Sequence, residues 1–190
     1  TDDPHTHGYA LFDDDIAATK RVLGIPEDQT FWVPPDVLSW YREVGRRGAD
    51  ERARWQERYA AHADRAVLDA CLAGRGLDGW EQHLPVWKPD DKPKATRVAS
   101  GECINAVLDS VPGLVGGGAD LTGNTGTQMK GEGVMSAEEP GGRQIFFGVR
   151  EHGMGGIMNG MALHGGVVPV GGTFLVFSDY MRGSVRLAAL

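Results

Sequence analysis

The feature that most constrains the fold is a run of alternating strand and helix patterns between Gln144 and Leu190. A short β-type segment, Gln144 to Val149, leads through the charged turn Arg150-Glu151-His152 into a helix rich in Gly and Met. A second β-type segment, Val167 to Gly172, follows that helix. This order is typical of a parallel α/β layer, in which sites gather at the carboxyl ends of the strands. We therefore predict an α/β fold with a parallel sheet and a site near Glu151.

The acidic residue at the start of that helix, Glu151, has two interpretations. Anionic side chains are favoured in the first helical turn by about 0.3 to 1 kcal/mol, which would make it an ordinary helix-start residue. Alternatively, it is a carboxyl group in a largely apolar pocket, where desolvation favours the protonated form and the group can donate or accept a proton. Three rings follow at a spacing of three, at Phe174, Phe177 and Tyr180. They favour the second interpretation, because rings around a carboxyl group can hold a flat heterocycle.

The composition limits the classes of partner. The net charge of −7 leaves no basic stripe for a phosphate backbone, so we expect no nucleic-acid binding. No segment has the roughly 18 consecutive apolar residues of a membrane span, so we expect no membrane partner. The two cysteines, Cys71 and Cys103, lack CxxC spacing, which indicates a reducing, cytoplasmic compartment. The histidines form no zinc pattern with them, and we expect no metal ligands in this chain.

Both ends of the sequence indicate a longer protein. Thr1 is not an initiator Met, and residues 185–190 stop inside an amphipathic helical pattern without a Gly or Pro signal. A helix that ended there would leave carbonyl groups without partners. We therefore expect this chain to be a fragment.

The first half of the chain is predicted to be mostly helical. After a loop that contains His7, three aspartates cap a short helix, Ile16 to Leu23, which Gly24 closes. Two further helices are expected, one opened by Pro34 and Pro35 and running to about Arg47, the other from Asp50 to Ala73. A Pro-, Lys- and Asp-rich linker, Leu84 to Pro93, separates them from the second half.

The second half is predicted to begin with a helix, Ala95 to Asp109, and a strand, Leu114 to Gly118. Arg97 stands near the start of that helix, where the helix dipole disfavours a cation. It is either a surface residue paired with a carboxylate or the ligand of an anion, for which the guanidinium geometry is suited. The Gly-rich segment 129–143 is expected to be a mobile surface loop.

Four motifs in one order carry a resemblance to a known family: ATR, GGGADLT, GVREHGMGGIMNGMALHGG and GGTFLVFSDYMRGSVRLAAL. They resemble the pyrimidine-binding domain of transketolases, which are thiamine-diphosphate enzymes, and the likeness covers nearly the whole chain. It implies the end of a diphosphate-binding domain at 1–24, a helical linker region at 25–94 and an incomplete pyrimidine-binding domain at 95–190. Such a chain belongs to an enzyme that moves a two-carbon ketol unit from a ketose phosphate to an aldose phosphate.

The resemblance also implies residues for the cofactor, thiamine diphosphate. Glu151 would hydrogen-bond a ring nitrogen of the aminopyrimidine, and the rings after GGTF would wall it: Phe174, Phe177 and Tyr180. Asp120 would lie by the cofactor channel near a subunit interface. His7, in an HG dipeptide typical of the family, would contact both cofactor and substrate.

Sugar-phosphate substrates would be held by a second set of residues. Arg97, in the ATR motif, would grip the substrate phosphate, and Asn124 stands where the family usually has a Ser in that phosphate site. The GDG-to-Asn pattern that binds the divalent metal, Mg²⁺ or Ca²⁺, and the diphosphate is absent from this sequence. We therefore expect the metal ligands to lie outside this chain, and the fragment alone to be inactive.

Glycines in the expected helix after Glu151 indicate a close neighbour, since each weakens a helix by about 1 kcal/mol relative to Ala. They are Gly153, Gly155, Gly156 and Gly160. In the family the corresponding helix lies against a two-fold-related subunit, which implies a homodimer with the active site at the interface.

Two alternatives remain open at this point. One is another thiamine-diphosphate enzyme with the same pocket, such as a deoxyxylulose-phosphate synthase or a dihydroxyacetone synthase. The other is a non-catalytic dimerisation or regulatory chain that kept the fold. Departures from the usual family residues at Tyr9, Phe12 and Asn124 give this last alternative some weight, less than the resemblance gives to an active enzyme.

Overall fold

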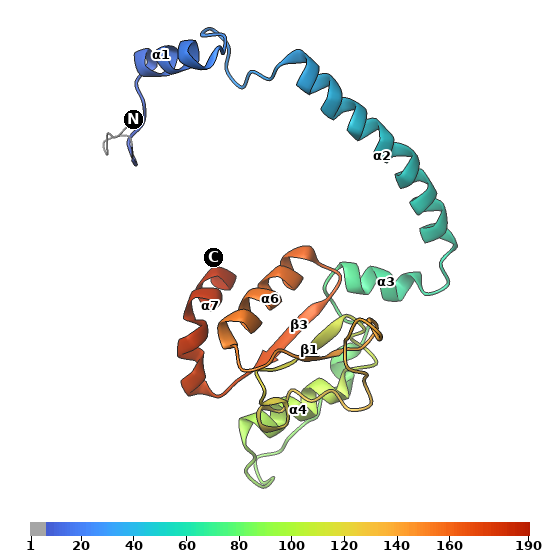
Figure 1. Ribbon diagram of the computed structural model, residues 1–190. Coiled ribbons are helices and arrows are strands. Elements are labelled where there is room, and N and C mark those ends of the chain that lie inside the picture. The colour runs from blue at the N-terminus through green and yellow to red at the C-terminus, as the bar shows by residue number, and fades with distance from the viewer. Residues whose placement is uncertain (1–6) are drawn as a thin grey trace. The chain divides into compact units, whose positions relative to one another are not determined.

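The computed structural model describes residues 7–190 (Figure 1). The chain divides into two compact units, Thr1–Ala61 and His62–Leu190. None of the described helices is long and apolar enough to cross a membrane.

The first unit consists of two exposed helices, α1 (Asp13–Leu23) and α2 (Pro35–Ala61), and neither buries a residue. Three aspartates form the first turn of α1, inside the helix rather than before it as predicted. This placement is favourable because the helix dipole attracts anions to its amino end. Gly24 closes α1 in the left-handed conformation, with φ 69°, as the sequence predicts.

The predicted break between Arg47 and Asp50 is wrong, because α2 runs through this region without interruption. A Cβ atom added to Gly48 would meet nothing within 4 Å, so no neighbour forces the chain to turn there. Ion pairs three residues apart support the helix on both sides of the glycine, namely Glu43–Arg46 and Glu51–Arg54. The break comes later, at 62–64, before α3 (Arg65–Leu72).

The second unit is built on a three-stranded parallel sheet with the order β2-β1-β3. Its strands are β1 (Leu114–Gly118), β2 (Gln144–Phe146) and β3 (Val168–Gly172). Gly116 pairs with Gln144 on one side and Val170 on the other. The remaining elements are η2 (Trp80–His83), α4 (Thr96–Ala106), α5 (Thr122–Thr125), α6 (Glu151–His164), η3 (Leu175–Met181) and α7 (Arg182–Ala189). The predicted parallel α/β class is confirmed.

Two hydrophobic clusters hold helices against this sheet. The first joins α4 and the turn after it to β1 and β3; its buried members are Ile104, Val107, Leu108, Val111, Leu114 and Met129. The second joins α6 to the chain after β1 and β2 through Met154, Ala119 and Phe147. Side chains alternate along a strand, so Val168 and Val170 pack in the first cluster while a Cβ on Gly171 would meet Met158 of α6.

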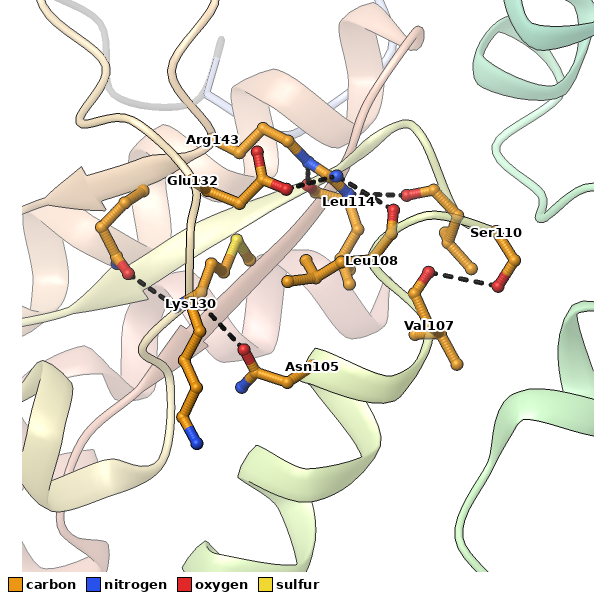
Figure 2. Close-up of polar contacts among 11 residues, drawn as sticks. Asn105, Val107, Leu108, Ser110, Leu114, Lys130, Glu132 and Arg143 are labelled. Atoms are coloured by element: carbon orange, nitrogen blue, oxygen red, sulfur yellow. Dashed lines mark hydrogen bonds and ion pairs between the residues drawn. The ribbon is translucent and has the colours of Figure 1, made fainter.

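The segment 129–143 is not simply the surface loop that its composition predicts, because both of its ends are anchored. Met129 is 3% exposed, and its amide donates to the Gln144 side chain. Arg143 donates to three backbone carbonyls in and beside the turn that joins α4 to β1, those of Leu108, Val111 and Leu114 (Figure 2). It also pairs with Glu132 at 3.2 Å, so the exposed parts of the segment, residues 130–131 and 134–141, lie between buried or half-buried anchors.

Candidate functional site

A cavity of about 670 Å³ opens where the chain leaves the carboxyl ends of β1 and β2. It is lined by Ala119, Asp120, Leu121, Val149, Arg150, Glu151, His152, Gly153, Phe177 and Tyr180. The left-handed conformation of Gly148, with φ 74°, turns the chain out of the sheet after β2 and toward α6. This is the edge at which parallel sheets place their ligands.

Glu151 is the first residue of α6, and it is only 8% exposed. Glu151 is thus a helix-start residue, as one interpretation of the sequence has it, and it also lines a cavity, as the other requires. Among residues 7–190 no group donates a hydrogen bond to its carboxylate. Because Glu151 lines the cavity, its carboxylate is open to a ligand there, and a ligand that presents a polar N–H edge would supply the hydrogen bond that the described residues do not.

The aromatic residues after β3 form one row. They lie in or beside the 3₁₀ segment η3, where side chains three residues apart align. The ring centroids of Phe174 and Phe177 are 5.9 Å apart, and those of Phe177 and Tyr180 are 6.1 Å apart. Phe177 and Tyr180 line the cavity, whereas Phe174 is not among its lining residues and supports Phe177 by stacking.

Asp120 lines the same cavity in an uncommon backbone conformation. Its φ of 61° is in the left-handed region, which costs a non-glycine residue about 1 to 2 kcal/mol, less for Asp. Strain of this kind gathers at binding sites. The conformation brings Asp120 to the cavity directly after β1.

A second, more polar cavity of about 290 Å³ contains Arg97. We call it the Arg97 groove; it is lined by Arg97, Val98, Gly101, Glu102, Asn105, Gly123, Gly126, Gln128 and Lys130. One segment, 119–126, contributes to the walls of both cavities, because its start lines the first and its end lines the second. Asn124 belongs to this segment and is exposed, but it is in neither set of lining residues.

No carboxylate within residues 7–190 forms an ion pair with Arg97, which favours the anion-binding interpretation over a surface ion pair. The acid beside it, Glu102, is paired instead with Lys94 at 2.7 Å. The pKa of Glu102 is lowered mainly by the hydrogen bond from Lys94, against a raising effect of burial. His7 is exposed in a bend before α1, in the first compact unit.

Several lining residues were not singled out from the sequence. Arg150 and His152 flank Glu151 and contribute to the first cavity. Lys130 and Asn105 contribute to the Arg97 groove. Proximity to Glu151 in the sequence could have revealed the first pair, but nothing local in the sequence distinguishes the second.

Comparison with known proteins agrees with this geometry. The family model for the transketolase pyrimidine-binding domain matches residues 92–190, and the model for the transketolase thiamine-diphosphate-binding domain matches residues 1–80. The chain belongs to the transketolase family. The transketolase of Mycobacterium leprae is 46% identical over 198 aligned residues, which cover 97% of this chain and 28% of that protein. A transketolase of Geobacillus stearothermophilus is 43% identical with the same coverage of both chains.

Solved transketolase structures have the same fold. A structure from Pichia stipitis, in complex with sedoheptulose 7-phosphate, superposes with a TM-score of 0.81 at 37% identity and covers 97% of this chain and 29% of that one. The Leishmania mexicana transketolase superposes with a TM-score of 0.80 at 36% identity, over 94% of this chain and 27% of that one. This chain thus spans about 28% of the length of the curated relatives that it matches.

Proposed function

We propose that this chain is part of a transketolase, which transfers a two-carbon ketol unit from a ketose phosphate to an aldose phosphate. The observation that carries the proposal is the buried carboxyl group of Glu151, which faces a largely apolar cavity beside Phe177 and Tyr180 in a chain of this family. Thiamine diphosphate, when bound, supplies the carbon nucleophile and the electron sink of this chemistry.

The cavity suits the flat aminopyrimidine of that cofactor. Its rings offer apolar walls, and Glu151 has a carboxylate that no described residue within 7–190 satisfies. In our proposal Glu151 exchanges a proton with a ring nitrogen, and the low polarity around it keeps water from competing. Phe177 and Tyr180 wall the ring, Phe174 fixes Phe177, and Asp120 faces the same space.

Substrate binding is assigned to the Arg97 groove and to residues near it. Arg97 binds the phosphate of the sugar as a bidentate donor, Asn124 offers an amide to it, and His7 is a contact of cofactor and substrate. The described residues 7–190 hold no cluster of three His, Cys, Asp or Glu side chains able to bind a metal. We propose that the Mg²⁺ or Ca²⁺ ion is held by residues outside this chain.

We further propose a homodimer whose active site lies at the subunit interface. Gly155 is covered by Ser184 of α7, but a Cβ atom on Gly156 or Gly160 would meet nothing within 4 Å. That open face of α6 supports the approach of a second backbone in an isologous contact. A cytoplasmic location is also proposed, supported by two cysteines that are both free. The net charge of −7 supports the absence of a nucleic-acid partner.

Substrate pairs test the proposed function in the full-length protein that carries this sequence. With thiamine diphosphate and Mg²⁺, we expect turnover of xylulose 5-phosphate with ribose 5-phosphate, and none of pyruvate with glyceraldehyde 3-phosphate. The reverse result would assign the chain to a deoxyxylulose-phosphate synthase. No turnover of either pair, together with no binding of millimolar cofactor, would indicate a non-catalytic chain.

A further inference from the structure

The Arg97 groove contains a second cation, Lys130, to which neither the sequence nor the proposed function assigns a role. Lys130 follows the buried Met129 in the first part of the anchored segment 129–143. Within residues 7–190 neither Lys130 nor Arg97 is ion-paired to a carboxylate. The groove therefore presents two cations without a carboxylate in ion-pair contact, although Lys130 is close enough to Glu102 to contribute to the lowering of its pKa.

Asn105 of α4 fixes the position of Lys130. Its side-chain amide donates to the carbonyls of Gly101, at 2.8 Å, and Gln128, at 2.9 Å. Its side-chain oxygen accepts the Lys130 backbone N–H at 2.8 Å (Figure 2). Two of these three bonds join α4 to the chain around Lys130, and the third, to Gly101, lies within α4, so the helix that carries Arg97 also sets the backbone of Lys130.

The negative charge in the groove is controlled by a separate contact. Glu102 lines the groove, and Lys94 donates to both of its carboxylate oxygens, at 2.9 and 2.7 Å. The Lys94 ammonium also lies 5.5 Å from the centre of the Trp87 ring, a cation–π contact that helps to hold it. The pair cancels the charge of Glu102, and the groove keeps the net positive charge of Arg97 and Lys130.

We propose that Lys130 is a second phosphate-binding residue that acts with Arg97 on the phosphoryl group of the sugar substrate. The inference rests on the proposed function and adds a residue to its substrate site. Arg97 can donate two parallel hydrogen bonds from its planar guanidinium to the phosphate oxygens. Lys130 adds a compact positive charge on a flexible side chain, so the two residues bind the dianionic phosphate in different ways. Asn105 is the positioning residue, and the Lys94–Glu102 pair keeps the groove able to accept an anion.

The test compares K130Q with the matched control K88Q, an exposed lysine in the linker, both in the full-length protein. For ribose 5-phosphate we expect K130Q to raise KM about three- to ten-fold with kcat nearly unchanged, as for the loss of one charge-assisted contact. KM for an unphosphorylated aldose should not change, and K88Q should match the wild type. E102Q should lower KM for the phosphorylated sugar, because it leaves Lys94 uncompensated.

An equal change of KM for both sugars, or no change for either, would overturn the inference while leaving the proposed function intact. An inactive wild-type protein would overturn the proposed function instead. Inorganic sulfate then tests the groove without turnover, through its stabilisation of the full-length protein against heat. Loss of a sulfate-dependent rise in Tm in K130Q, but not in K88Q, supports the two-cation groove, and an equal rise in all proteins contradicts it.

Discussion

Helices α2 and α6 both contain glycines and glutamate, but these residues have different surroundings in the two helices. The 27 residues of α2 include none that is buried, and its charged side chains pair along the surface. The 14 residues of α6 bury Glu151, Met154 and Gly155 against the sheet and α7. A glutamate on α2 contributes to a solvated face, whereas the one that begins α6 lines a cavity. The difference teaches that function follows the neighbours of a residue and not its type alone.

The largest expected effect comes from removing the acid of α6. We predict that E151Q in the full-length protein lowers kcat for ketol transfer about 10²- to 10⁴-fold, the usual range for loss of a general acid or base. The exposed Glu57 of α2 provides the matched control, and E57Q should leave kcat unchanged. Steady-state kinetics on both variants checks this. Comparable activity in the two variants would remove the functional distinction between the helices.

A smaller effect is expected from crowding the buried side of α6. A Cβ atom on Gly155 would collide with the Ser184 side chain and approach the Met181 methyl group at 3.2 Å. Ser184 is 3% exposed and its hydroxyl is bonded to the Met181 carbonyl, so it has little room to move. We predict that G155A destabilises the protein by about 1 to 3 kcal/mol, measured by chemical denaturation. An unchanged midpoint would mean that α7 shifts freely.

The smallest effect, and the opposite sign, is expected on α2. A Cβ atom on Gly48 meets nothing within 4 Å, and the backbone there is helical. G48A should therefore stabilise the protein by about 0.5 to 1 kcal/mol, through helix propensity alone. Chemical denaturation of G48A beside G155A sharpens the contrast between the two helices. Destabilisation by G48A would show that another part of the full-length protein covers this face.

Much of the second unit follows from local sequence. The two β-type runs around α6 predict the parallel strands, and the position of Glu151 after the first run predicts its place at the carboxyl end of the sheet. The spacing of three residues between Phe177 and Tyr180 predicts that their rings lie on the same side of the segment that carries them. These signals are strong because period and order alone fix which face and which sheet edge a residue occupies.

Other features depend on partners far apart in the sequence. The position of Arg143 is set by carbonyls roughly 30 residues upstream, so a Gly-rich segment was predicted as a loop although both of its ends are anchored. Lys130 joins the Arg97 groove only through the Asn105 amide, which no periodicity reveals. On α2 the predicted break between Arg47 and Asp50 does not occur, because nothing obstructs the helix at Gly48 and ion pairs support it on both sides.

In the proposed function, Glu151 controls a proton on bound thiamine diphosphate. The most direct measurement is the rate at which the C2 hydrogen of the cofactor exchanges with deuterium in the full-length protein, followed by NMR after rapid quenching. We predict exchange at least about 10²-fold slower in E151Q than in wild type, with E57Q equal to wild type. Fast exchange in E151Q, with the cofactor still bound, would contradict the account.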